Sequence, residues 1–136
     1  MMPDCPLTEE EQKWLEGGIL EFNNGRYWHA HEDWEELWKS LKNKGADMNY
    51  ILGIQGLIQT TALMFQYERK KARGCLSMWS KLTEKLGLPE EPVFAELWSI
   101  DIPRILLEVS LFTEDASSDA PKWSLDCSSV QIHRTD

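Results

Sequence analysis

Residues 49–70 read NYILGIQGLIQTTALMFQYERK, and this stretch decides the fold class. Apolar side chains fall on nearly every face of the helix that these residues would form. A helix with so little polar surface usually lies at the buried centre of a bundle. The sequence therefore predicts a central helix that is surrounded by other helices.

The sequence on both sides supplies those other helices. Thr8 and Glu11 form a capping box, which predicts a helix running to about Asn23. Asn24 and Gly25 are residues that commonly end a helix. Further helices are predicted over residues 27–44, 72–86 and 92–100, and another begins at Asp101 and continues past 111.

These elements predict an all-α fold, a compact single-domain helical bundle of about five to six helices with an irregular C-terminal tail. We assign residues 1–114 to the helical domain. Residues 116–121 read ASSDAP, and no sustained period follows them. We therefore assign residues 115–136 to an irregular or partly disordered tail.

Composition excludes several classes of protein. The 136 residues carry a formal net charge of −9, so a nucleic-acid backbone would be repelled and we expect no nucleic-acid partner. No apolar run approaches the roughly 18 residues of a membrane span, so we expect no membrane partner. The three cysteines form no pairing pattern, and no signal-peptide pattern is visible at the N-terminus. We expect a cytoplasmic protein.

The second predicted helix carries the densest chemistry. On a wheel of about 100° per residue, His31 lies at the edge of the core-facing stripe, beside Trp38. Glu35 follows His31 by one turn, and Glu32 lies further toward solvent. A histidine and a carboxylate at this spacing can share a proton, or they can hold a divalent metal ion if another residue adds a ligand. The alternative is an ordinary pair of side chains at the edge of the core.

The central helix carries a narrow stripe of three glutamines, Gln55, Gln59 and Gln66. Amides on an otherwise apolar helix need hydrogen-bond partners when they are buried. His31 and Glu35 on a neighbouring helix would supply them. The stripe predicts either a ligand pocket or a buried network that fixes the register of the helices.

Two segments resemble the motifs of the family called domain of unknown function 309. The first comprises Phe22, Asn23, Gly25, Tyr27, Ala30, His31, Glu32, Trp34, Glu35, Leu37 and Trp38, and the second comprises Gln55 to Gln59 with Arg73 and Gly74. The resemblance covers about residues 15–86 and implies a small all-α domain. Members of that family are labelled, by prediction only, as metal-dependent hydrolases.

The resemblance also suggests site residues. The polar motif positions are Asn23, His31, Glu32, Glu35, Gln55 and Gln59. Family members often carry histidine near the end of the second motif, where this chain has Phe65 and Gln66. If those histidines were metal ligands, this chain lacks them, which weakens the case for a metal.

Two functions stay open from the sequence. One is a hydrolase acting on a small molecule, with His31, Glu35 and Glu32 as catalytic residues and a divalent metal ion on His31 and Glu35 as the candidate cofactor. The other is a non-catalytic module that binds a ligand or another protein, including a second copy of the chain as a homo-oligomer. In both, Asn23, Gln55, Gln59 and Trp38 are the candidate ligand-binding residues, and a small molecule is the candidate ligand.

Overall fold

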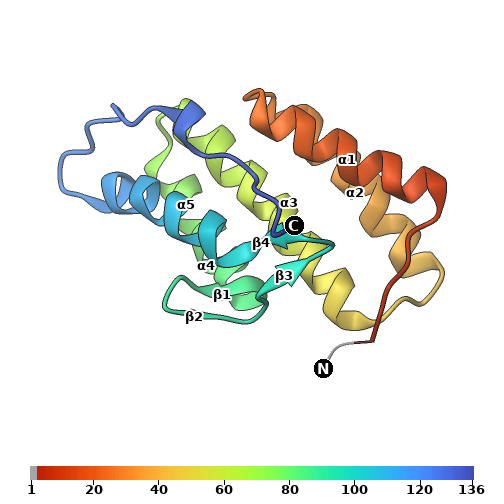
Figure 1. Cartoon of the computed structure of the whole chain (residues 1–136). Helices are drawn as coiled ribbons and strands as arrows, with labels where there is room; N and C mark the ends of the chain where they lie inside the picture. Colours follow the sequence, from red (N-terminus) through yellow and green to blue (C-terminus); the bar gives the residue numbers. More distant parts are fainter. Residues whose placement is uncertain (1–2) are drawn as a thin grey trace.

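The structure is a computed structural model that describes residues 3–136, and it is built of five α-helices with two short β-hairpins (Figure 1). The elements in chain order are α1 (Glu9–Asn23), α2 (Tyr27–Asn43), α3 (Met48–Glu68), α4 (Ala72–Leu86), β1 (Gly87–Leu88), β2 (Glu91–Pro92), β3 (Glu96–Leu97), β4 (Ile100–Asp101) and α5 (Ile102–Ser117). The predicted all-α bundle is confirmed. No helix within these described residues has the length and apolar character needed to cross a lipid bilayer.

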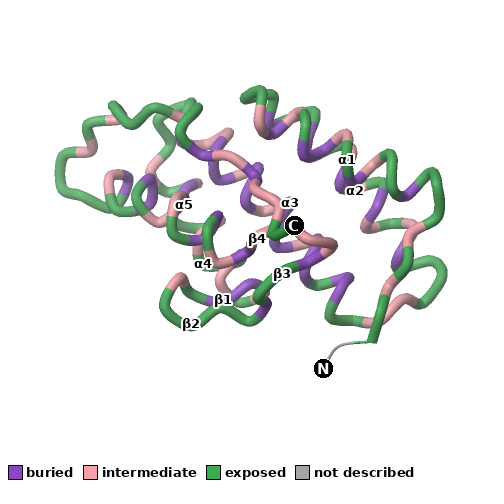
Figure 2. Tube along the Cα trace, viewed as in Figure 1, coloured by how far each residue is buried: buried purple, intermediate pink, exposed green. Residues whose placement is uncertain are grey.

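Helix α3 is the centre of the bundle, as predicted. It packs against α2 on one side and α4 on the other, and Figure 2 shows buried residues on its successive turns. Ile54, Leu57, Leu63 and Met64 are fully buried in it. Their burial supplies the main driving force that holds the helices together, at about 1.5–3 kcal/mol for each large apolar side chain.

Helices α1 and α2 form a hairpin next to α3. The capping box predicted at Thr8 is present: the Glu11 amide donates to the Thr8 hydroxyl, and the Thr8 amide donates to the Glu11 carboxylate. The two helices meet at Gly18, where the Trp34 indole occupies the space that a Cβ would need. This close approach allows the Trp34 N–H to donate to the Leu15 carbonyl at 3.2 Å.

The prediction of a helix over residues 92–100 is wrong. The chain there forms strands β2, β3 and β4, and β3 pairs with β4 in an antiparallel hairpin. Trp98 and Ser99 make its turn with φ of 47° and 66°, the left-handed backbone that two-residue hairpin turns require. The prediction failed because the buried residues Phe94, Leu97 and Ile100 are three apart, a spacing that mimics one face of a helix.

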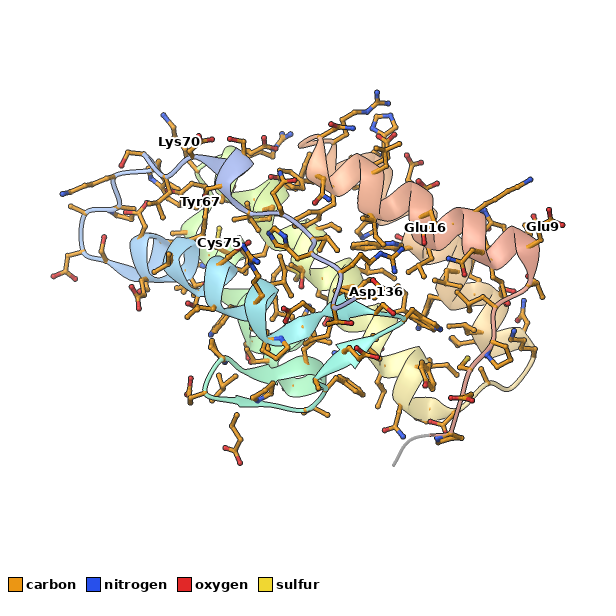
Figure 3. All side chains as sticks on the ribbon, in the orientation of Figure 1. Glu9, Glu16, Tyr67, Lys70, Cys75 and Asp136 are labelled. Atoms are coloured by element: carbon orange, nitrogen blue, oxygen red, sulfur yellow. The ribbon has the colours of Figure 1, made fainter. Side chains whose placement is uncertain are left out.

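Helix α5 begins as the sequence predicts, with the Asp101 side chain accepting from the Arg104 amide. It ends at Ser117, three residues into the segment 115–136 that was predicted as tail. A C-terminal tail follows, irregular apart from a short 3₁₀-helix, Cys127–Ser129. Near its start, the tail is anchored by Tyr67, whose hydroxyl donates to Asp115 at 2.7 Å and accepts from the Leu125 amide at 3.2 Å (Figure 3).

The tail then crosses back over the bundle to end beside β4 (Figure 1). Val130 and Ile132 are buried along this path. The Asp101 amide donates to the His133 carbonyl, and the Thr135 amide donates to the Ser99 carbonyl. The tail therefore closes one side of the molecule and joins α1 to the β3–β4 hairpin.

Candidate functional site

The candidate site is a groove between α2 and α3. The two helices run antiparallel, because the start of α2 lies opposite the end of α3 and the later part of α2 lies opposite the earlier part of α3. The groove contains two successive hollows. The Trp28 hollow, of about 110 Å³, is lined by Tyr27, Trp28, His31, Thr61, Ala62, Phe65 and Gln66. The Trp38 hollow, of about 250 Å³, is lined by Glu35, Trp38, Gln55, Ile58 and Gln59.

Helical periodicity brings these side chains to one face. Trp28, His31, Glu35 and Trp38 follow one another at spacings of three and four residues, so they share the side of α2 that borders the groove. Gln55, Gln59 and Gln66 follow the same rule on α3. His31 and Glu35 therefore line the same groove as the three glutamines. The predicted hydrogen bonds between them are not formed among the described residues, and Gln59 Oε1 has no hydrogen-bond partner there.

The wall of the Trp28 hollow is aromatic. The Trp28 ring stacks on the His31 ring with their centroids 5.3 Å apart and their planes within 2° of parallel. Phe65 approaches Trp28 from α3 at 5.8 Å. Trp28 remains 54 % exposed despite these contacts, so this end of the groove presents a large apolar surface to solvent.

His31 and Glu35 join the two hollows. His31 Nδ1 lies 2.8 Å from Glu35 Oε1, and the His31 and Glu35 side chains are 21 % and 38 % exposed. The two atoms are close but are not aligned as a hydrogen bond. The pair is thus held in contact at the mouth of the groove, where both groups remain within reach of a bound molecule.

The Trp38 hollow contains buried polar atoms that have no partner. Within residues 3–136, four side-chain atoms are buried without a hydrogen bond: Glu21 Oε2, His31 Nδ1, Trp38 Nε1 and Gln59 Oε1. Two of them still lie next to a charged or polar group, because Glu21 Oε2 is 2.7 Å from Arg26 Nε and His31 Nδ1 is 2.8 Å from Glu35. The other two atoms, Trp38 Nε1 and Gln59 Oε1, belong to residues that line the same hollow.

The remaining predicted residues divide into two groups. Gln55 lines the Trp38 hollow, and Gln66 lines the Trp28 hollow. Glu32 is exposed on α2 and lines neither hollow. Asn23 is also outside both hollows, since its carboxamide pairs with the backbone of Ile132 in the tail.

Ile58, Ala62 and Phe65 line the groove although no sequence motif marks them as site residues. The signal that would have identified them is the register of the helices, because each turn forward along α2 meets a turn backward along α3. Trp38 was assigned to the core-facing stripe of α2, but it is only half-buried. Lys42 lies over its ring at 4.1 Å from the centroid.

The donor set does not fit a metal centre. Structural and catalytic zinc sites take at least three protein ligands from histidine, cysteine and carboxylate side chains. No cluster of three such side chains is found across the described part of the chain. His31 and Glu35 supply two donors, and the residues that face them are glutamines and aromatic side chains.

Wider depressions lie elsewhere on the surface. One of about 420 Å³ lies between α4 and α5, and another of about 490 Å³ lies along α2 beside Trp14 and Lys44. Neither is lined by any of the four unpartnered atoms. The chemistry is concentrated in the smaller hollows, and we assign the candidate site to the α2–α3 groove on that basis.

Comparison with known proteins agrees with the resemblance seen in the motifs. Residues 15–78 match the model of a family described as a domain of unknown function, DUF309. This span includes all of α2 and α3, and therefore both walls of the groove. No curated protein and no solved structure matches the chain.

Proposed function

We propose that this protein is a ligand-binding helical module whose α2–α3 groove takes a small polar molecule. The observation that carries the proposal is the pair of buried, unpartnered atoms, Trp38 Nε1 and Gln59 Oε1, in one hollow. A buried polar group without a partner costs about 1–3 kcal/mol. A ligand that supplies the missing partners recovers this free energy on binding.

The composition of the groove supports the same function. Ligand sites commonly combine apolar and aromatic walls with a small number of polar groups that fix orientation. Here Trp28 and Phe65 provide the aromatic wall, while Glu35, Gln55 and Gln59 provide the polar groups. The hollows measure about 110 and 250 Å³, which favours a small-molecule ligand over a large cofactor.

The test is a fragment screen followed by amide and indole NMR spectra of the ¹⁵N-labelled protein. Fragments that bind the groove should shift the Trp38 indole signal, which Trp38→Phe identifies by removing it. Trp38→Phe should also lower the affinity for these fragments by about tenfold, because it deletes one hydrogen-bond donor and keeps an aromatic ring. Trp79→Phe, on α4, is the matched control and should leave binding unchanged. A library from which no fragment shifts groove signals would overturn the proposal.

A second candidate function is hydrolysis assisted by a carboxylate, which the 2.8 Å contact between His31 and Glu35 favours. Glu35 would act as the base and His31 as the proton carrier, while Gln55 and Gln59 would orient substrate or water. The resemblance to a family labelled as hydrolases is the other support for this candidate.

A panel of chromogenic esters and amides tests the second candidate. If the protein turns over any of them, Glu35→Gln should lower the rate by about 10²–10⁴, the usual contribution of a general base. Glu36→Gln, which changes the exposed neighbouring acid, should leave the rate unchanged. Absence of turnover across the panel, or equal rates in both variants, would count against catalysis at this pair.

We also propose a cytoplasmic location. All three cysteines, Cys5, Cys75 and Cys127, are free thiols, which suits a reducing compartment. The net charge of −9 weighs against a nucleic-acid partner.

We further propose that the protein self-associates through the exposed end of the groove at Trp28. Light scattering of wild type and Trp28→Ala tests it, because only the wild type should then exceed the monomer mass.

A further inference from the structure

The Trp38 hollow contains one unpartnered donor and one unpartnered acceptor. The Trp38 indole N–H can only donate, and Gln59 Oε1 can only accept. A group that satisfies both must itself carry an acceptor and a donor. A hydroxyl carries both on one oxygen atom, whereas a carboxamide offers a carbonyl oxygen and an N–H as two separate atoms a short distance apart.

We propose that the Trp38 hollow recognises the carboxamide group of its ligand, either a primary amide or a peptide bond. The ligand carbonyl accepts from Trp38 Nε1, and the ligand N–H donates to Gln59 Oε1. This inference rests on the proposed binding function and names the class of ligand for it.

Charge and hydrogen-bonding capacity argue against the other small polar groups. A carboxylate has no donor for Gln59, and the Glu35 carboxylate on the rim would repel it. An ammonium group has no acceptor for the Trp38 N–H, and Lys42 already lies over the Trp38 ring. An ester has the acceptor but lacks the donor. A neutral amide leaves neither protein atom unpaired, and unlike a hydroxyl it serves Trp38 and Gln59, on two different helices, with two different atoms.

Access to the two atoms requires a movement at the rim. Trp38 Nε1 and Gln59 Oε1 both lie beneath the surface. Glu35, at 38 % exposure, and half-buried Gln55 line the same hollow. These long side chains can change rotamer without disturbing the apolar core, which opens the hollow to a flat group such as an amide.

The neighbouring Trp28 hollow defines what the amide is attached to. Its wall is made by Trp28 and Phe65. His31 is seven residues from Trp38 on α2, and Phe65 is six residues from Gln59 on α3, so the two hollows are about 9–10 Å apart along the helices. An amide carrying an aromatic or other apolar group at the end of a chain of about five carbons therefore matches both hollows.

Three probes that share one carbon skeleton test the inference: 6-phenylhexanamide, methyl 6-phenylhexanoate, and 6-phenylhexanoate. Titration of the ¹⁵N-labelled wild type should give a dissociation constant for the amide roughly tenfold lower than for the ester, because the ester leaves Gln59 Oε1 unpaired. The Trp38 indole signal should shift with both probes. The carboxylate should bind most weakly.

Matched variants assign the preference to its residue. Gln59→Met has nearly the same shape without the acceptor, and it should remove the preference for amide over ester. Gln12→Met changes an exposed glutamine on α1 whose side-chain amide donates to Glu16, and it should keep the preference. Melting temperatures measured alongside identify any variant that fails to fold, and the wild-type comparison of amide with ester needs no variant.

Each contrary outcome is distinct. Equal binding of amide and ester, or tighter binding of the carboxylate, overturns amide recognition while ligand binding in the groove stands. If none of the three probes binds while other fragments still shift the Trp38 signal, amide recognition is likewise overturned and ligand binding in the groove stands. If no fragment of any class shifts groove signals, the proposed function fails together with the inference.

Discussion

The Asn23 carboxamide pairs with the Ile132 backbone in both directions. Asn23 Nδ2 donates to the Ile132 carbonyl at 3.2 Å, and the Ile132 amide donates to Asn23 Oδ1 at 2.6 Å. The two residues are 109 positions apart in the chain. Asn23 thus acts as a clamp that holds the C-terminal tail against the end of α1.

We expect Asn23→Ala to release the tail without unfolding the bundle. The substitution removes two hydrogen bonds and leaves two backbone groups unpaired, at a cost of about 1–3 kcal/mol. Hydrogen exchange should therefore speed up over the last residues of the tail. Asn24→Ala, at the exposed neighbouring position, is the control and should change neither exchange nor melting. Unchanged protection at Ile132 in Asn23→Ala would refute the clamp.

The α1–α2 contact gives a second prediction, at two adjacent glycines. A Cβ on Gly18 would lie 2.0 Å from Trp34 Nε1, and the fully buried indole has no room to move. We expect Gly18→Ala to lower the free energy of unfolding by about 3 kcal/mol through overpacking. Urea denaturation of the purified variant measures the loss.

Gly17→Ala is the matched control for this prediction. A Cβ there would meet the Asp33 carboxylate at 3.0 Å, and that side chain can swing aside. Replacing glycine by alanine within a helix contributes up to about 1 kcal/mol of stability. Gly17→Ala should therefore be neutral or stabilising, and a loss equal to that of Gly18→Ala would contradict the assigned role of Trp34.

Much of the fold follows from local signals in the sequence. The capping box at Thr8 and the apolar run of α3 predicted helices that are present, because these features act within a few residues. Residues 92–100 were predicted as a helix because the spacing of Phe94, Leu97 and Ile100 does not distinguish a helical stripe from two tight hairpins. The left-handed turn at Trp98 and Ser99 carries no glycine to mark it.

The site was predicted in part for the same reason. The His31–Glu35 pair lies on one helix, so periodicity alone was sufficient to bring the two residues together. Asn23 matches a motif position, but it contacts the distant tail, and no local pattern reveals a partner so far along the chain. The Phe65 wall depends on the register between α2 and α3, which is a property of packing.

Glu11 should make stability depend on pH in the acidic range. Its side chain is 1 % exposed, and its carboxylate accepts from Lys44 at 2.7 Å and from Ser40 at 2.6 Å. Burial by itself raises the pKa of Glu11, but hydrogen bonds from Lys44, Ser40 and the Thr8 amide together outweigh it and lower the pKa to about 2.

A carboxyl group whose pKa falls on folding stabilises the protein above its unfolded pKa and loses that contribution as the pH drops. The ordinary pKa is 4.5, so the contribution of Glu11, roughly 3 kcal/mol, should disappear between about pH 4.5 and pH 2. The measurement is urea denaturation of wild type and Glu11→Gln across this range. The difference between them should be largest at neutral pH and shrink toward pH 2, while exposed Glu10→Gln should match the wild type throughout. If the difference in the free energy of unfolding between the two proteins stayed constant with pH, Glu11 would not be the ionised, ion-paired group described here.

The last prediction concerns divalent metals. Among the described residues, His31 and Glu35 are the histidine and carboxylate side chains that line the groove, and two such ligands are too few for the closed tetrahedral coordination of a structural zinc. Because a ligand stabilises a folded protein according to its affinity, a weak two-donor contact should leave the melting temperature nearly unchanged at micromolar metal. We expect melting curves with zinc, manganese, nickel or magnesium to overlay those recorded after chelation, both for wild type and for His31→Ala. A rise of several degrees that His31→Ala abolishes would mean that a ligand from a bound molecule or a second copy completes the site, and it would favour the hydrolytic candidate over simple binding.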